Sequence, residues 1–472
     1  MVAIATDPLK IKFIDLLFNE INIGTDSHEY FIGIGKSDQY DSANDNIITP
    51  LRHLKDEREA RNNVESVMKL PTTNVSFVVP RHNWSSGSIY DSFSDHVVGY
   101  PTNTYYVLTE DNQVYICLQA SKDASGNANT STVKPSFSAA GVDKRHAFKT
   151  ADGYIWRFLY EISTTRNNLF LTSSFMPTQF IDSSNDTTAT EVEQLSVRAE
   201  ALARGNGQIL GAEIVNAGAG YSSAPTITIK GDGNGAVATC TVSGGQIAKV
   251  EMTCNISDSG MGSGYNVARM EISGGGSPTE NAILRPIIGP RDGLGADPRI
   301  DLKSSSLMAV VKPAGTQGGT FNITNDFRQI TLFRNLRRRD SAGGVGFISK
   351  GTSDRANRVL TLQGNLGSLV ADQKITGDSG TVAWIDQVDS NGSGKGLVYY
   401  HTNNQFAIHN KGPGIFSPSE TITGASAGTG IVASDSSVTL NPYSGELLYI
   451  DSRARIIRSA DQTEDIKVIL TV

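Results

Sequence analysis

The clearest pattern of apolar and polar residues lies at the end of the chain, in residues 444–472. From Ile466 to Val472 every second residue is apolar, and Lys467 and Thr471 point to the other side, which is the period of a β-strand with one buried face. A second strand is expected at residues 447–450, followed by a polar bend that carries arginines. Because chain ends fray unless they are docked, this end predicts a strand that closes a sheet begun much earlier, with insertions in between.

Helical spacing of apolar residues occurs in two places near the N-terminus. One helix is expected from Pro8 to about Ile21, with Asp7 as its cap. A second is expected within residues 51–68, where the charged run KDEREAR would be solvated. Elsewhere, aromatic and β-branched runs bounded by turn residues predict strands. These runs are residues 30–35, 74–79, 105–108, 113–118, 152–162, 306–311 and 327–333.

A glycine-rich segment that begins near residue 205 repeats itself. Gly218-Ala219-Gly220-Tyr221 recurs as Gly262-Ser263-Gly264-Tyr265, and Ile229-Lys230-Gly231 recurs as Ile272-Ser273-Gly274. Neither copy could bury a face alone, so we expect the two to pack together as one small sandwich.

A second repeat begins near residue 343. Lys374-Ile375-Thr376-Gly377 and Thr421-Ile422-Thr423-Gly424 are each followed by a glycine-rich bend and a strand. A hairpin of residues 396–401 and 406–409 is expected between them. This pattern predicts a second repeat-built β module that ends near residue 440.

Composition agrees with a β-rich chain of several domains. The 472 residues exceed one ordinary core, and 47 glycines with 19% charged residues are typical of many strands and turns. The net charge of −7 argues against general nucleic-acid binding, and no run of 18 apolar residues predicts a membrane span. Cys117, Cys240 and Cys254 lack metal-ligand spacing and the N-terminus lacks signal-peptide features, so we expect reduced cysteines in a protein made in a cytosol.

Two glycine-rich motifs have a chemical and a structural interpretation. Gly377-Asp378-Ser379-Gly380 resembles the nucleophile turn of a serine protease, but the second repeat copy, Gly424-Ala425-Ser426-Ala427-Gly428, lacks the aspartate. A turn is therefore favoured over a nucleophile. Gly231-Asp232-Gly233-Asn234-Gly235 resembles part of a calcium loop without the acid that completes one, which favours a β-turn.

Histidines offer no convincing metal site either. His401 and His409 could meet across a hairpin but have no third ligand nearby. His82 and His96 flank a loop with Trp84, where packing is the simpler interpretation. We therefore predict no catalytic, cofactor-binding or metal-binding residues.

The one dense basic run is RNLRRRD, which holds Arg334, Arg337, Arg338 and Arg339. Phosphate binding would need neighbouring aromatic residues or a glycine-rich loop, and arginine is also common at protein interfaces. We expect these four arginines, and the two N-terminal helices, to contact partner proteins.

Several stretches resemble, in the same order, the baseplate wedge protein family (gene product 8) of T-even-type contractile-tailed bacteriophages. Together with the N-terminal helix, they mark regions that make up about half of the chain. They are YFIGIGKSDQY (30–40), VVPRHNW (78–84), VYICL (114–118), DGYIWRFLYEI (152–162), DFRQITL (326–332), and the closing GELLYI (445–450) and DQTEDIKVILTV (461–472).

The resemblance implies an elongated, mainly β, multi-domain protein with a two-layer β-sandwich core and a few helices near the N-terminus. It also implies a structural subunit of the virion tail baseplate, assembled in the host cytoplasm, that acts as a homodimer with other wedge proteins and has no enzymatic activity.

The repeat modules have no counterpart in that family, so we interpret them as insertions at surface loops. The expected divisions are a family-like core in residues 1–200, 296–342 and 441–472, with inserted β modules in residues 201–295 and 343–440.

Two other functions remain open at this point. In the first, the inserted modules bind a host glycan or receptor by presenting Tyr221, Tyr265, Tyr399 and Tyr400. In the second, the protein is a depolymerase, which would need paired carboxylates in a groove. The chain shows no pair of carboxylates that its sequence singles out.

Overall fold

A computed structural model describes residues 5–22, 28–36, 40, 45–96, 104–137, 143, 145–182, 188–254, 260–312, 327–339, 345–347, 358–371, 373–401, 416–425, 428–436, 440–457 and 465–472. In these ranges the chain is mainly β, as the sequence predicts, with many short sheets and five α-helices. It divides into two compact units. Unit 1 holds residues 1–18, 76–308 and 469–472, and unit 2 holds residues 19–75 and 309–468.

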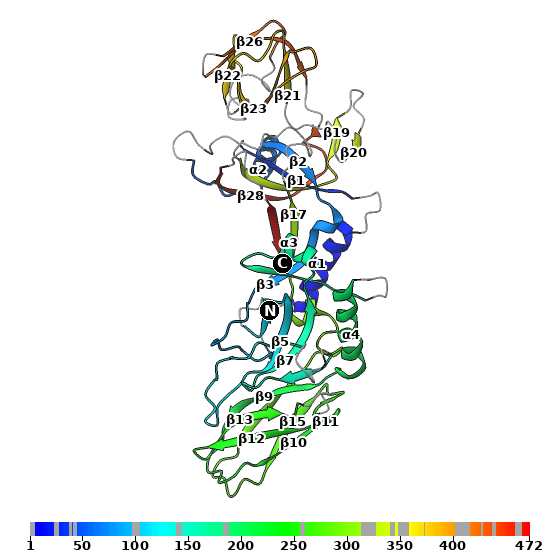
Figure 1. Ribbon diagram of the computed structural model, residues 1–472, viewed down its shortest axis with the longest axis vertical. Coiled ribbons are helices and arrows are strands. Elements are labelled where there is room, and N and C mark those ends of the chain that lie inside the picture. Colours follow the sequence, from blue (N-terminus) through cyan, green and yellow to red (C-terminus); the bar gives the residue numbers. More distant parts are fainter. Residues whose placement is uncertain are drawn as a thin grey trace. The chain divides into compact units, whose positions relative to one another are not determined.

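Unit 1 is organised around a four-stranded sheet of order β4-β5-β7-β6. Its two central strands are buried along almost their whole length, and Trp156 is fully buried among aromatic neighbours. Helix α4 (Ala189–Arg204) lies against β7 (both labelled in Figure 1). The sequence pattern did not predict α4, although Thr188 and Glu191 form the capping box that starts it. The strands are β4 (Tyr106–Leu108), β5 (Gln113–Gln119), β6 (Ala147–Lys149) and β7 (Ile155–Glu161).

A second four-stranded sheet has the order β29-β17-β3-β8. The last strand of the chain therefore lies beside a strand that occurs far earlier, as its alternating pattern predicts. Ile466 and Val468 are buried, but Val472 is 52% exposed, so burial fades toward the end. The strands are β3 (Val75–Pro80), β8 (Phe175–Thr178), β17 (Ser306–Val311) and β29 (Ile466–Thr471).

Three helices accompany these sheets. Helix α1 spans Asp7–Asn22, one residue longer at each end than expected, because the Thr6 carbonyl already accepts a bond from the Lys10 N–H. Helices α3 (Thr164–Phe170) and α5 (Pro298–Asp301) are short. Among the described residues, no helix is long and apolar enough to cross a membrane.

The glycine-rich module of unit 1 (green in Figure 1) pairs each repeat copy with the other. The first copy supplies β9, β10 and β12, the second supplies β13, β15 and β16, and the pairs are β9 with β16, β10 with β15, and β12 with β13. Tyr221 and Tyr265, which occupy equivalent places, share one core. The strands are β9 (Ile209–Asn216), β10 (Thr226–Gly231), β11 (Asn234–Ala236), β12 (Ala238–Ser243), β13 (Gln246–Met252), β14 (Met261–Ser263), β15 (Ala268–Ser273) and β16 (Ile283–Ile288).

Unit 2 contains a sheet of order β2-β1-β18-β28. The helix expected within residues 51–68 is confirmed as α2 (Leu54–Asn62), and the alternating run that follows is a strand, not predicted from the sequence, that pairs with β1. One prediction is corrected. The polar bend expected after residue 450 is instead a continuation of β28, because this segment keeps pairing with β18 as far as Ile456. The elements are β1 (Tyr30–Gly35), α2 (Leu54–Asn62), β2 (Val64–Lys69), β18 (Phe327–Arg334) and β28 (Glu446–Ile456).

The second module forms a closed barrel of order β21-β24-β23-β22-β25-β26 (Figure 1). The repeated strands β22 and β25 pair with each other, Thr376 opposite Thr423, and the barrel has its own apolar core. The second strand of the expected hairpin, residues 406–409, lies outside the described residues. The strands are β21 (Arg358–Leu362), β22 (Lys374–Gly377), β23 (Val382–Ser390), β24 (Gly396–His401), β25 (Thr421–Gly424) and β26 (Thr429–Ser436). A small sheet of order β20-β19-β27 also belongs to unit 2; its strands are β19 (Arg337–Arg339), β20 (Val345–Phe347) and β27 (Leu440–Asn441).

Candidate protein interface

The most concentrated exposure of large apolar side chains in unit 2 lies just before α2. Ile47, Ile48, Leu51 and Leu54 are each more than half exposed, at 51%, 56%, 63% and 66%. Residues 45–50 have no regular structure, and Pro50 disfavours helix at the residue before it. Apolar groups gathered in this way on a surface are typical of a contact site.

An ion pair fixes the start of this segment to the sheet. Asp45 accepts hydrogen bonds from the Arg328 guanidinium at 2.8 and 2.9 Å, and the Arg328 side chain is only 4% exposed. Partial burial is the largest single influence on the pKa of Asp45 and would raise it, but the bonds from Arg328 and from the Tyr40 N–H, together with the nearby positive charges, outweigh it and lower that pKa. The Tyr40 hydroxyl donates to the carbonyls of Arg328 and Arg453, which joins the segment to β18 and β28.

Helix α2 is held from its other end by Arg61. This side chain is 7% exposed, and its guanidinium donates to the main-chain carbonyls of Pro442, Ser444 and Gly445. It also lies over the Phe333 ring, 5.6 Å from the ring centre. A planar group that makes several directed bonds holds α2 beside the start of β28.

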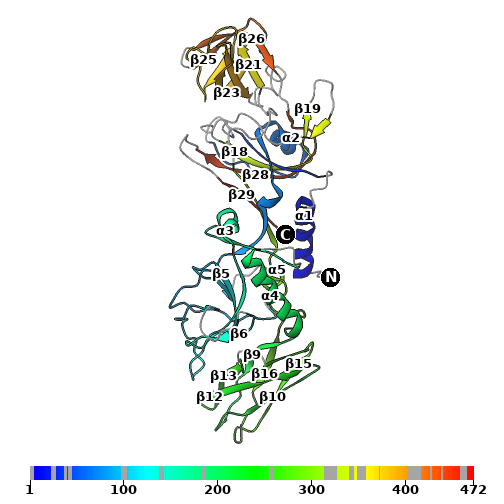
Figure 2. The same cartoon turned by 45° about the vertical axis from the view of Figure 1, so that its right-hand side comes forward.

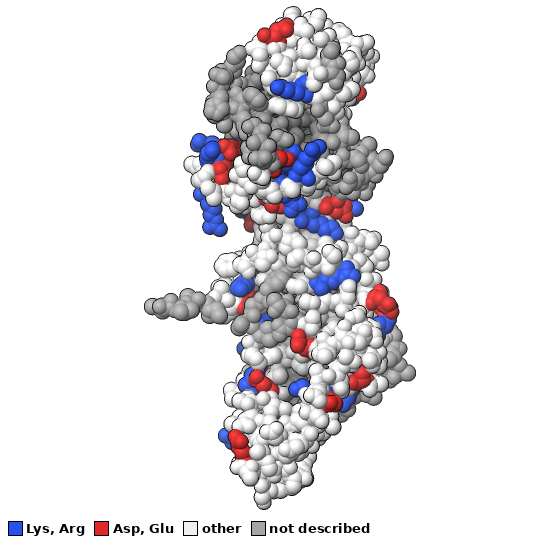
Figure 3. Space-filling model, turned by 90° about the vertical axis from the view of Figure 1, so that its left-hand side faces the viewer, with Lys and Arg blue, Asp and Glu red and all other residues white. Residues whose placement is uncertain are grey.

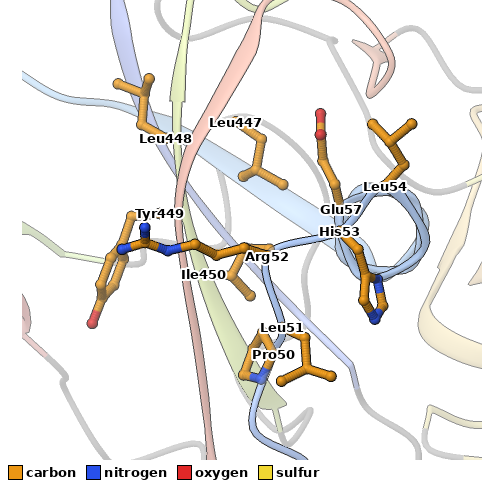
Figure 4. A pocket seen from close by; sticks show the side chains of 10 residues that line it. All are labelled: Pro50, Leu51, Arg52, His53, Leu54, Glu57, Leu447, Leu448, Tyr449 and Ile450. Carbon is orange, nitrogen blue, oxygen red and sulfur yellow. The ribbon is translucent and has the colours of Figure 1, made fainter.

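Between these elements lies a pocket of about 460 Å³, lined by residues 50–54, Glu57 and residues 447–450. Figure 4 shows Leu447 between β28 and α2, with Arg52 extending across the opening toward Tyr449. Its walls combine apolar and polar surface in about equal shares, and Arg52 and Glu57 supply one charge of each sign. Such a mixture of apolar and charged groups is typical of a contact site for another protein.

The sequence analysis missed this surface. Ile47, Leu51 and Leu54 have the i, i+4, i+7 spacing of a helix, but Pro50 disfavours helix at the residue before it, and the helix begins only at Leu54. Large apolar residues in a segment that a proline keeps out of the helix suggest a surface contact.

The four arginines that were predicted to contact partner proteins lie in different surroundings from one another. Arg334 is already paired with Glu20 at 2.7 Å and Glu446 at 3.0 Å. Burial and the nearby Glu20 raise the pKa of Tyr30 to about 12 in the same cluster. Arg337 lies in β19 (Arg337–Arg339), where its N–H donates to the Ser444 hydroxyl. The side chains of the next two arginines lie outside the described part of the chain, so partner contact through this run stays a prediction.

The serine of the protease-like motif lies in a turn. Its N–H donates to the Glu420 carboxylate at 2.8 Å, and its hydroxyl is 2.9 Å from that of Thr381. Gly380 has a φ of +81°, which glycine adopts without strain. Asp378 accepts a bond from the Thr421 N–H and so braces the second repeat copy. These contacts account for the motif as a turn.

The calcium-like motif is also a turn. Asp232 accepts bonds from the N–H groups of Asn266 and Val267 at 2.9 and 3.0 Å. These bonds lower the pKa of the Asp232 carboxyl to about 2. Across the described residues, no group of three His, Cys, Asp or Glu side chains is placed to hold a metal ion.

The histidines of the sequence analysis are dispersed. His82 packs edge-on against Tyr106, with ring centres 5.0 Å apart, and burial lowers its pKa. His96 is exposed and lies beside Arg285 at 2.5 Å. Trp84 bonds to the Ser131 hydroxyl. The His401 side chain and His409 lie outside the described residues.

Three of the four tyrosines expected on the surface are in the core. Tyr221, Tyr265 and Tyr400 are 4%, 3% and 0% exposed, so the prediction that they meet a glycan is wrong. Tyr221 and Tyr265 fill the shared core of the glycine-rich module, where they close the space that its small side chains leave. Tyr399 is half-buried.

Charges do not form a single basic surface on the face drawn in Figure 3, where Lys and Arg are interspersed with Asp and Glu. No protein-family model matches the sequence, and a search of curated proteins finds no match either.

Proposed function

We propose that the protein is a structural subunit of the baseplate wedge of a contractile phage tail. It acts by contact with a second copy of itself and with other wedge proteins, and it performs no chemistry. Its place of assembly is the host cytoplasm.

The observation that carries the proposal is the ordered series of stretches that resemble the baseplate wedge family. Three of them are neighbours in one sheet, since residues 30–35 form β1, residues 327–332 lie in β18 and residues 446–450 lie in β28. Two more, residues 114–118 and 155–161, lie in the adjacent strands β5 and β7. Stretches far apart in sequence thus form neighbouring strands, as expected if they belong to one structural core.

The pocket beside α2 supports the same proposal. A structural subunit that acts only through contacts with neighbouring proteins needs surfaces that are apolar at the centre and charged at the rim. The exposed residues 47–54 and the two charges of the pocket provide such a surface.

Electron microscopy tests the proposal directly. A gold-labelled antibody against the protein should decorate the baseplate end of tailed particles from the source. Antibody against a capsid protein of the same particles serves as the control. Label on the head alone, or on no particle, would contradict the proposal.

A further inference from the structure

Strand β28 is a long border strand. It spans Glu446–Ile456 and pairs with β18 on one side. Among the described residues, no strand pairs with its other side, because β28 ends the sheet order β2-β1-β18-β28 (Figure 2). A border strand of this length offers a row of backbone donors and acceptors to another chain.

The sequence of this strand complements itself when it is read in both directions from Ser452. When two β28 strands pair antiparallel with Ser452 at the centre, each residue lies opposite a residue with which its side chain can interact favourably. Asp451 faces Arg453, an opposite charge, and Tyr449 faces Arg455. The remaining partners are apolar: Leu447 with Ile457, Leu448 with Ile456, and Ile450 with Ala454.

The pocket fits the same arrangement. Its β28 wall is formed by residues 447–450, and the pairing places residues 454–457 of a second copy beside them. Ile457 is 66% exposed in the single chain, which is costly in water unless another surface covers it. Because the arrangement has two-fold symmetry, each copy brings Ile457 to the other's pocket.

We infer that two copies of the protein associate by antiparallel pairing of their β28 strands about Ser452, with Ile457 of each copy at the pocket of the other. The charges at positions 451 and 453 select this register. A slip of one residue would place both charges opposite uncharged residues, and a slip of two would place either Asp451 opposite Asp451 or Arg453 opposite Arg453. This inference rests on the homodimer of the proposed function and adds the surface and the register.

Light scattering during size-exclusion chromatography measures the state of the full chain. We expect a mass of about twice 50.5 kDa for the native sequence. Ile457→Glu should raise the dissociation constant of the dimer by about tenfold or more, since both pockets lose their apolar contact. Val267→Glu is the matched control, because Val267 is 70% exposed but lies in unit 1; it should leave the dimer unchanged.

Cross-linking tests the register. Ser452→Cys should give a covalent dimer under mild oxidation, because a residue on the two-fold axis faces its own copy within reach of a disulfide. Ile450→Cys should not, since position 450 faces position 454 of the other copy. The native chain, which contains Cys117, Cys240 and Cys254, gives the background.

The outcomes separate this inference from the proposed function. A dimer that resists Ile457→Glu and forms no Ser452→Cys cross-link would overturn the register and leave the homodimer in place. A monomer at every concentration would overturn both the register and the homodimer. Label at the baseplate would still support the structural role in that case.

Discussion

At the scale of single residues, Arg61 organises the candidate interface. Its guanidinium donates to three carbonyls of the turn before β28 and also lies over the Phe333 ring. Removing one partner from such a buried arrangement leaves the others unsatisfied, which costs more than the bonds themselves contribute. Arg61 therefore supports both the position of α2 and the pocket beside it.

Replacing Arg61 by methionine should lower the free energy of unfolding of unit 2 by about 2–4 kcal/mol, because the apolar stem remains but the carbonyls lose their donors. Arg58→Met is the control, since Arg58 is exposed on the same helix. Chemical denaturation monitored by circular dichroism gives both values. Equal effects of the two changes would show that the carbonyl bonds contribute little.

Asp301 is the second residue that leads to a prediction, because its carboxyl should make the stability of the protein depend on pH. It is buried and accepts a bond from the Gly295 N–H at 2.7 Å. Burial raises the pKa of its carboxyl to about 8, whereas an exposed aspartate titrates near pH 4. Between these values the folded protein keeps a proton that the unfolded chain releases. Stability should therefore fall as pH rises, by up to about 1.4 kcal/mol per pH unit from this group.

The Asp301→Asn variant removes this titration and keeps an oxygen for the Gly295 bond. We expect its melting temperature, relative to that of the native protein, to rise steadily between pH 5 and pH 8. Calorimetry at several pH values measures the difference. A difference that stays constant over this range would mean that the carboxyl is ionised in the folded protein.

At the scale of elements, the two copies of the glycine-rich repeat share an unusual backbone. Gly218 and Gly262 have φ values of +70° and +62°, and the glycines two residues later have +81° and +79°. At Gly262 an added Cβ would lie 2.4 Å from the Asn234 carbonyl oxygen. Both backbone conformation and space therefore require glycine there.

Gly262→Ala should destabilise the module more than Gly244→Ala does. Gly244 has nearly the same φ, +60°, but no atom lies within 4 Å of the place of its Cβ. Both changes lose the left-handed freedom of glycine, at about 1 kcal/mol, and only Gly262→Ala also forces the backbone apart. Denaturant unfolding of the two variants should differ by at least another kcal/mol or so, and equal values would remove the steric explanation.

Much of the strand pattern could be predicted, because alternation reports which face of a strand is buried. The prediction failed for β2, because a charged helix directly precedes Val64 and the sequence pattern did not separate the two elements. In the structure, the pairing with β1 shows that this segment is a strand. The ion pair of Asp45 with Arg328 could not be predicted at all. Its members are far apart in sequence, and only the sheet brings them together. The pocket could not be predicted for the same reason, since β28, which is far away in sequence, supplies four of its ten lining residues.

At the scale of the whole molecule, the barrel of residues 358–436 is the most self-contained part. It is closed, so it has no border strand, and Val359 of its first strand pairs with Ser436 of its last. Its apolar core includes Ile375, Ile422 and Val432, all fully buried. A part with its own core and closed hydrogen bonding should not need the rest of the chain.

The segment of residues 355–438 should therefore fold when it is produced alone, with dispersed amide resonances and one cooperative thermal transition. The rest of the chain, with a short glycine-serine linker in its place, should keep its own transition. An unfolded segment would show that the barrel depends on neighbouring parts. An unfolded remainder would show the reverse dependence.

The pairing within the glycine-rich module also bears on how the protein arose. Every main pair there joins a strand of one copy to a strand of the other: β9 to β16, β10 to β15, and β12 to β13. This is the pattern of a symmetric dimer whose two subunits have been joined end to end. It indicates an ancestral gene that encoded a single copy, whose product formed a homodimer. A later duplication then fused two copies into one gene.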